Sequence, residues 1–229
     1  MALTAESLTT IRALEEELSL EPGTSSGALE RAIKAASAEI SRVTGRVLYR
    51  VADAVDRVRT YGGHDLLVPR APIVSVTSVE RLGDDGTTVE ETYAASSYQI
   101  SDPDAGILFR SSGWPWASAQ RSGVTNLPVA GREQPSIRVT YTAGWITPYQ
   151  ASATGGSVGT RDLPYDLEEA CLIAAASRYR SRGRDRAVVS ERLGPESVRY
   201  AAPSSSSVGR SSWLPEEAYS IANSYRRTL

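Results

Sequence analysis

Gly23, Ser25 and Gly27 form the part of the sequence that most resembles a catalytic motif, the G-x-S-x-G pattern of serine hydrolases. In those enzymes the serine lies on a turn between a strand and a helix, and a histidine accepts its proton. Here the residues before Gly23 have the apolar spacing of a helix, and the only histidine, His64, would have to approach Ser25 through the fold. The pattern therefore favours a loop between two helices, and a serine hydrolase using Ser25 and His64 is the weaker alternative.

Patterns that bind metals or phosphates are incomplete. Asp102, Asp104 and Gly106 match the start of a calcium-binding loop, but the glutamate that would follow is missing, so a turn is favoured. The glycines of 155–159 lack the lysine and the hydroxyl residue of a phosphate-binding loop. A single cysteine, Cys171, allows no disulfide within the chain and no cysteine-based zinc site. We expect no catalytic residue, no metal and no cofactor.

Arginines form the one charge cluster of the chain. They recur from position 178 to position 192, and Asp185 and Glu191 dilute them. Such a cluster can contact DNA phosphates, form ion pairs with an acidic protein surface, or simply be solvated at the end of a helix. All three interpretations stay open from the sequence. The arginines are Arg178, Arg180, Arg182, Arg184, Arg186 and Arg192.

The overall composition is that of a globular protein of 229 residues, 41% hydrophobic and 23% charged, with a formal net charge of −2. This charge excludes a basic protein that coats nucleic acids through its total charge. The longest purely apolar run, 170–176, is much shorter than the roughly 20 residues of a membrane span. The N-terminal residues carry neither a basic start nor an apolar stretch, so we expect a soluble protein with no secretion signal and no membrane partner.

Two helices are predicted to precede Gly45. Apolar residues recur at steps of three and four over 4–20, where Thr4 is the expected N-cap. A second apolar stripe runs over 26–44, and glycine is the residue type expected just after a helix. The short loop between them predicts an antiparallel pair. The stripes consist of Leu8, Ile11, Leu14 and Leu18 in the first helix and of Leu29, Ile33, Ala36, Ile40 and Val43 in the second.

A third helix is predicted over 162–182 and carries the first arginines of the cluster at its C-terminal end. Asp162 is expected to cap it, and the acidic residues of the first turn suit the positive end of the helix dipole. Its buried stripe is predicted to hold Leu167, Ala170, Cys171, Ala174 and Ser177. In the helical core as a whole we expect burial of Leu8, Leu14, Ile33, Ile40, Leu167 and Cys171.

Residues 47–146 have an apolar period close to two, which predicts an antiparallel β-domain inserted between the helices. The clearest alternation is at 137–141. Turn residues predict one hairpin around 84–86 and another around 102–106. Residues 113–131 are predicted to be loops.

The last part of the chain is predicted to be an arm, a linker and a docking segment. Residues 184–200 suggest a short hairpin or extended arm. The segment 213–229 is amphipathic, but so short a helix is not stable alone in water. We expect it to dock on a partner, and folding back onto its own core is the alternative. Its apolar face consists of Leu214, Ala218, Ile221 and Tyr225.

These elements predict an α+β fold, a small α-helical bundle with an inserted antiparallel β-domain and an extended C-terminal arm. The expected divisions are the N-terminal helices of the core at 1–46, the inserted β-domain at 47–146, a flexible loop at 147–161, the core helix and a short extended arm at 162–200, a serine-rich linker at 201–212 and the C-terminal docking segment at 213–229.

Several segments resemble the head–tail connector (adaptor) family of long-tailed bacteriophages. Together they cover most of the chain, although the β region and the two linkers are long for that family. These departures leave open which surface meets which partner. The segments are 35–46, the strand Pro-Ile-Val-Ser-Val-Thr-Ser-Val at 72–79, the turn Tyr-Thr-Ala-Gly at 141–144, the helix start Leu-Pro-x-Asp-Leu-x-x-Ala at 163–170, Leu-Gly-Pro-Glu-Ser-Val-Arg-Tyr at 193–200, and 214–227.

The resemblance implies a non-enzymatic adaptor ring, usually of twelve subunits, beneath the portal of a phage head. Implied partners are further copies of the chain, the portal protein, and the tail or a stopper protein. Packaged DNA would pass through the channel without sequence-specific contact. The implied location is the head–tail junction of the virion, after synthesis in the host cytoplasm. The competing function is a DNA-binding protein that uses the Arg178–Arg192 cluster. Residues expected at the portal or neighbour interface are Arg178, Arg180, Arg182, Arg184, Trp213, Leu214, Ile221, Tyr225, Arg226 and Arg227.

Overall fold

The computed structural model of the chain describes residues 2–23, 26–83, 85–115, 119–121, 128–133, 137–152, 158–182, 190–193, 196–199 and 212–227. The chain forms two compact units. Unit 1 combines Met1–Gly45 with Thr147–Leu229, and unit 2 is Arg46–Ile146. Helices and antiparallel sheets confirm the predicted α+β class.

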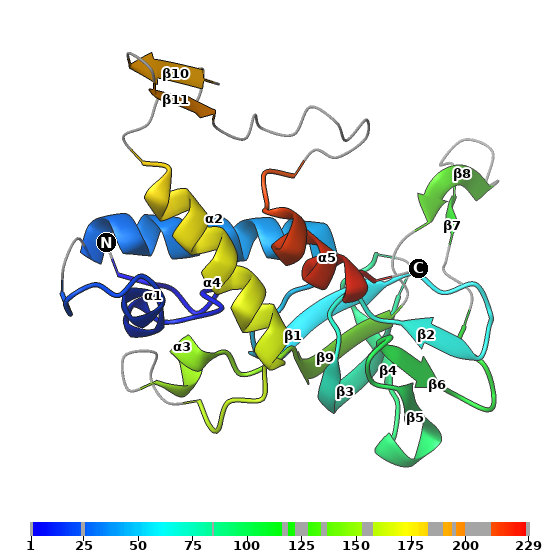
Figure 1. Ribbon diagram of the computed structural model, residues 1–229. Coiled ribbons are helices and arrows are strands. Elements are labelled where there is room, and N and C mark those ends of the chain that lie inside the picture. Colours follow the sequence, from blue (N-terminus) through cyan, green and yellow to red (C-terminus); the bar gives the residue numbers. More distant parts are fainter. Residues whose placement is uncertain are drawn as a thin grey trace. The chain divides into compact units, whose positions relative to one another are not determined.

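The elements are labelled in chain order in Figure 1. The helices are α1 (Ile11–Glu17), α2 (Ser26–Thr44), α3 (Pro148–Ala151), α4 (Tyr165–Arg180) and α5 (Glu216–Ser224), with one 3-10 helix, η1 (Ala95–Ser97). The strands are β1 (Val51–Val58), β2 (Asp65–Leu67), β3 (Ile73–Leu82), β4 (Val89–Thr92), β5 (Gln99–Asp102), β6 (Ile107–Phe109), β7 (Ala119–Arg121), β8 (Pro128–Glu133), β9 (Ile137–Ala143), β10 (Ser190–Leu193) and β11 (Glu196–Arg199).

The core of unit 1 lies between α2 and α4, which cross one another in Figure 1. The helix predicted over 26–44 is confirmed as α2, and Gly45 follows it with a φ of 65°. Small buried residues on α4, among them Ala170 and Ala174, let the two helices approach closely. All six residues predicted to be buried have no exposed surface: Leu8, Leu14, Ile33, Ile40, Leu167 and Cys171.

Helix α1 is shorter than the helix predicted over 4–20. Thr10 rather than Thr4 is its N-cap, and the Thr10 hydroxyl accepts a hydrogen bond from the backbone N–H three residues on. Just before this cap, the backbone N–H of Leu8 donates to the Ser37 hydroxyl on α2 at 3.1 Å. Residues 4–9 are not helical, and this bond to α2 satisfies a backbone N–H that a helix would otherwise have paired. Leu8 is therefore buried although the helix does not extend to it.

Helix α4 begins later than predicted, and its N-cap is Pro164 rather than Asp162. The ring of Pro164 keeps the backbone of the residue before it out of the helical region, so the helix cannot extend back to Asp162. A short helix, α3, occupies part of the stretch expected to be an irregular loop. Thr147 and Gln150 form a capping box around its first turn, a signal that requires only a hydroxyl and an amide three residues apart.

Unit 2 is built from antiparallel strands. A four-stranded sheet has the order β1-β9-β3-β4, and a three-stranded sheet has the order β2-β6-β5. The two predicted hairpins are confirmed as β3–β4 and β5–β6. Strand β9 alternates between buried and half-buried residues along its whole length. Residues of both sheets share one apolar cluster: Leu66, Val68, Ile73, Val79, Tyr93, Leu108, Trp114, Ile137, Val139, Tyr141 and Ala143.

Two further strand pairs lie outside these sheets. Strands β7 and β8 pair within the stretch 113–131 and just beyond it, which was wrongly predicted to be loop. That stretch has no apolar alternation, and Gly131 lies within β8, so its sequence carries little strand signal. Strands β10 and β11 pair within 184–200, where a short hairpin or arm was predicted.

Candidate interaction surface at the C-terminal end of helix α4

The predicted interface residues that the structure describes lie on the C-terminal end of α4 and along the segment 212–227, both in unit 1. Helix α5 packs against α2 and α4. Ala218 and Ala222 are fully buried, and Leu214 is 9% exposed. The chain's own helices thus cover the apolar face of the segment predicted to dock on a partner. This arrangement is the alternative that the sequence left open.

The start of the C-terminal segment is held by an acidic residue of α2. The Glu39 carboxylate accepts hydrogen bonds from the Ser212 side chain and the Trp213 backbone N–H, and it forms an ion pair with Arg42 at 2.6 Å. Arg42 above all, together with these two donors, holds the pKa of Glu39 below its ordinary value, although burial acts in the opposite direction. Glu39 therefore remains a carboxylate that can anchor the segment.

The end of the segment is held by two further contacts. The Tyr225 hydroxyl donates to the Asp166 carboxylate, whose two oxygens both lie at 2.8 Å, and the backbone N–H of Arg227 donates to the Thr44 carbonyl at 3.0 Å. Burial, reinforced by the Asp166 charge, raises the pKa of Tyr225 to about 12. The sequence did not reveal Asp166 as an anchor, because its partner Tyr225 lies 59 residues away. Acidic residues are also common in a first helical turn, so the presence of Asp166 there needed no other explanation.

An exposed surface remains at the end of α4, and we call it the Arg–Trp surface, defined by Arg178, Arg180, Arg182 and Trp213. The Arg178 guanidinium lies 4.9 Å from the centre of the Trp213 ring, which is 40% exposed. The Arg182 guanidinium lies 4.2 Å from the Tyr179 ring. Arg180 is exposed. The guanidinium groups of Arg178 and Arg182 are thus stacked on rings, which lowers the conformational entropy that they would lose on binding.

The remaining predicted interface residues differ in position. Arg226 is exposed, whereas Ile221 and Arg227 are half-buried along the docked segment. Arg192 lies on β10, of which the backbone is described. Arg184 and Arg186 lie outside the described residues.

The structural context of the G-x-S-x-G pattern differs from that of a hydrolase. Gly23 follows helix α1 and precedes helix α2, with no strand before it, and Ser25 lies outside the described residues. His64 belongs to unit 2, where its Nδ1 is 3.0 Å from the Arg110 carbonyl oxygen and its ring stacks on Phe109. These contacts give His64 a local role in unit 2.

The Asp-x-Asp-x-Gly pattern forms the turn of the β5–β6 hairpin. The Asp102 carboxylate accepts a hydrogen bond from the Ala105 N–H at 2.8 Å, and Gly106 has a φ of 77°. Across the described ranges, no group of three acidic, histidine or cysteine side chains could hold a metal ion. A search of the same residues finds no helix with the length and hydropathy of a transmembrane span.

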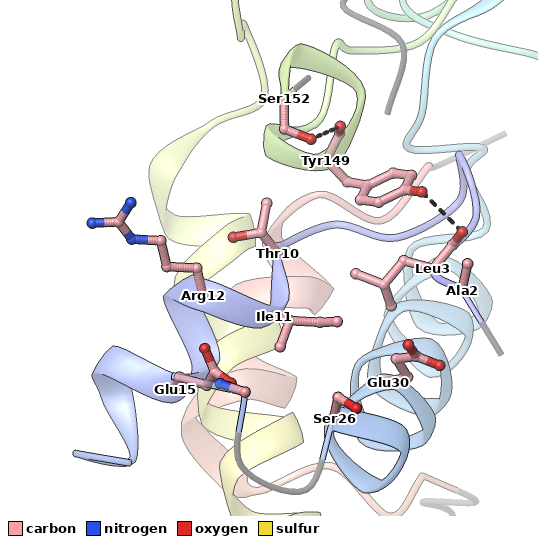
Figure 2. A pocket seen from close by; sticks show the side chains of 11 residues that line it. Ala2, Leu3, Thr10, Ile11, Arg12, Glu15, Ser26, Glu30, Tyr149 and Ser152 are labelled. Carbon is pink, nitrogen blue, oxygen red and sulfur yellow. Dashed lines mark hydrogen bonds between the residues drawn. The ribbon is translucent and has the colours of Figure 1, made fainter. Parts of the chain in front are cut away.

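One cavity of about 530 Å³ lies in unit 1, bordered by the N-terminal segment, α1, the start of α2 and α3 (Figure 2). Tyr149 closes one side, and its hydroxyl donates to the Leu3 carbonyl at 2.9 Å. Glu15 and Glu30 are the acidic groups of the lining, and Glu15 accepts a hydrogen bond from the Gly23 N–H at 2.8 Å. The lining contains no histidine, cysteine or lysine.

Comparisons with known proteins find likeness at the level of structure. Neither a family model nor a curated protein matches the chain. A chain in the neck of an empty gene transfer agent particle, solved with C6 symmetry, is 18% identical, with a TM-score of 0.54 over 100% of this chain and 94% of the other. A chain in the virion of the native particle is also 18% identical, with a TM-score of 0.52 at the same coverage.

A chain in the neck of the native particle, solved with C12 symmetry, is 19% identical, with a TM-score of 0.52 over 100% of this chain and 93% of the other. The chain has the fold of these particle proteins. The resemblance to head–tail connectors is thereby confirmed at the level of the fold. Both units take part, because the matches extend over the whole chain.

Proposed function

We propose that this chain is a structural adaptor in the neck of a phage-like particle, where copies form a ring between the portal and the tail or a stopper protein. The observation that carries this proposal is a fold shared along the entire chain with proteins of gene transfer agent necks. The role is structural and non-enzymatic, and the location is the head–tail junction. The C12 symmetry of one neck supports a ring of twelve copies.

The ring continues the channel through which packaged DNA passes. The chain has a formal net charge of −2, so a ring of many copies has no overall positive charge that would hold DNA by its phosphates. We propose that DNA passes without being retained through its phosphates, and that it makes no sequence-specific contact with the ring. The absence of an overall positive charge agrees with a channel wall that guides DNA rather than binding it.

The Arg–Trp surface is the contact that we propose for the portal or a neighbouring subunit. Arginine and tryptophan are enriched at the centres of protein interfaces, and stacked arginines make bidentate contacts with carboxylates. The docked segment contributes Trp213 to this surface, while its apolar face stays on the chain's own helices. An acidic protein partner is therefore proposed, and DNA contact by the same arginines is the competing outcome.

The experiment compares wild type with the double variant Arg180→Glu/Arg182→Glu. Native mass and negative-stain images of the purified wild type should reveal rings, and tailless particles lacking this chain should acquire it at the neck when it is added. The variant, whose substitutions are exposed, should keep its circular dichroism spectrum and lose binding to those particles. Chains that stay single at all concentrations and never bind the particles would refute the adaptor. Salt-dependent binding of wild type to DNA, lost in the variant, would favour the DNA-binding alternative.

A further inference from the structure

The four-stranded sheet of unit 2 ends in two edge strands that carry opposite charges. In the order β1-β9-β3-β4, the outer sides of β1 and β4 have no partner strand in the described part of the chain. Arg57 and Arg59 are exposed at the end of β1, and Glu90 and Glu91 are exposed on β4. Open strand edges present backbone N–H and C=O groups that can pair with another strand.

The two charged stretches lie level with each other across the sheet. Val58 on β1 pairs with Ile137, Ile137 pairs with Arg81, and Arg81 pairs with Glu91 on β4. These residues form one row from edge to edge. The adjacent row consists of Arg57, Arg138, Glu80 and Thr92.

We propose that β4 of one copy pairs with β1 of the next, so that this sheet continues from subunit to subunit around the ring. The inference rests on the proposed adaptor function and names the surface by which copies associate. All pairings in the sheet are antiparallel, so its four strands alternate in direction. Because four is even, a copy related by rotation about an axis along the strands presents its β1 antiparallel to β4. The alternation then continues without interruption around the ring.

Charge makes this pairing selective. Two β1 edges would bring arginines together and two β4 edges would bring glutamates together, so like edges repel whereas β1 and β4 attract. Within the residues that the structure describes, Arg57, Arg59 and Glu91 form no ion pair, and Glu90 forms a half-exposed one with Arg81 at 3.4 Å. A contact between two different edges is head-to-tail, which is the type of interface that closes into rings.

The other half of β1 is unsuited to such pairing. A bulge lies between Val51 and Ala54, and Asp53 within it has a φ of 46°, in the left-handed region. Bulges of this kind bend an edge away from further strands. The regular half of β1 is therefore the half that lies level with β4.

A charge-swap experiment tests the contact. The variant Arg57→Glu/Arg59→Glu has two acidic edges, and the variant Glu90→Arg/Glu91→Arg has two basic edges. Each alone should associate about tenfold or more weakly than wild type, whereas an equimolar mixture should form rings in which the two variants alternate. Native mass measures both results, and unchanged melting of each variant verifies that the exposed substitutions leave the fold intact.

A cysteine pair tests the register. In Arg57→Cys/Thr92→Cys, two strands separate the substituted positions within one copy, so their Cα atoms lie about 14 Å apart, beyond the roughly 7 Å limit of a disulfide. Oxidation can therefore link them only between copies, and it should produce a ladder of covalent oligomers. Cys171 does not compete because it is fully buried, and burial raises the pKa of its thiol to about 12. The control Ala52→Cys/Thr92→Cys places the first thiol about 17 Å further along β1 and should produce no ladder.

The outcomes separate the two proposals. Wild-type rings combined with no ladder, or with charge variants that still assemble alone, would refute the edge contact and leave the adaptor function intact. A wild type that never assembles would refute both.

Discussion

Replacing Gly144 by alanine should destabilise unit 2 strongly, because neighbouring backbone atoms leave no room for a side chain just after β9. Gly144 has a φ of 88°, in the left-handed region. A Cβ at this position would overlap the Tyr49 carbonyl oxygen and lie 2.8 Å from the Tyr49 carbonyl carbon. The Gly144 N–H donates to the Pro72 carbonyl at 2.9 Å, and its carbonyl accepts from Arg50 Nε at 2.7 Å. The residue therefore cannot move away without losing these bonds.

The magnitude has two parts. A left-handed backbone costs an alanine about 1–2 kcal/mol, and forcing extra volume into a packed site costs about 1–3 kcal/mol more. The sum for Gly144→Ala is about 2–5 kcal/mol. Gly45→Ala is the matched control, because Gly45 has a φ of 65° and no atom within 4 Å of a Cβ, so it should lose only the first part, about 1–2 kcal/mol.

Urea unfolding followed by circular dichroism measures both free energies of unfolding. We expect Gly144→Ala to be less stable than Gly45→Ala by about 1–3 kcal/mol, which is the packing cost alone. Equal destabilisation by the two substitutions would mean that Tyr49 yields to the new methyl group, and the reasoning from backbone overlap would be wrong.

Three further predictions concern unit 1. Ile40→Ala removes a fully buried side chain from α2, and urea titration should record a loss of about 2–5 kcal/mol; a loss near zero would contradict its place in the core. Thr10→Ala removes the N-cap of α1 and should cost about 1 kcal/mol in the same titration, with Thr10→Ser close to wild type. Tyr225 has an ordinary pKa near 10 when unfolded and one raised to about 12 in the fold, so its contribution is complete below pH 10 and is lost as the pH rises towards 12. Alkaline titration followed by tryptophan fluorescence should therefore show loosening of the C-terminal segment in wild type, and Tyr225→Phe should lack the step.

Local patterns predicted the elements whose burial follows a regular period. The spacing of Ile33 and Ile40 was sufficient for α2, and the alternation from Ile137 to Tyr141 was sufficient for β9. In both cases one face meets a core along the whole element, so the period of the sequence repeats the period of the contact.

Long-range polar contacts could not be predicted in this way. The bond between the Leu8 N–H and Ser37 shortens α1, and the bonds made by Glu39 and Asp166 keep the C-terminal segment on its own helices. Each depends on a partner distant in sequence, and serine, glutamate or aspartate on a helix is common for other reasons. The segment's apolar face was correctly recognised, but the sequence alone could not decide what covers it.

The pairing of β1 with β9 has a consequence for how the two stretches of unit 1 come together. Unit 1 is assembled from two stretches separated by the whole of unit 2, and Val51 pairs with Ala143 where the chain enters and leaves that unit. Once this pair forms, the loop between the two helical stretches shortens from about a hundred residues to roughly ten. The entropic contribution to the free energy of closing that loop then falls by about 2 kcal/mol. Formation of this sheet therefore lowers the cost of bringing the two helical stretches together. We expect a mutation that weakens the Val51–Ala143 end of the sheet to slow the assembly of the helices as well.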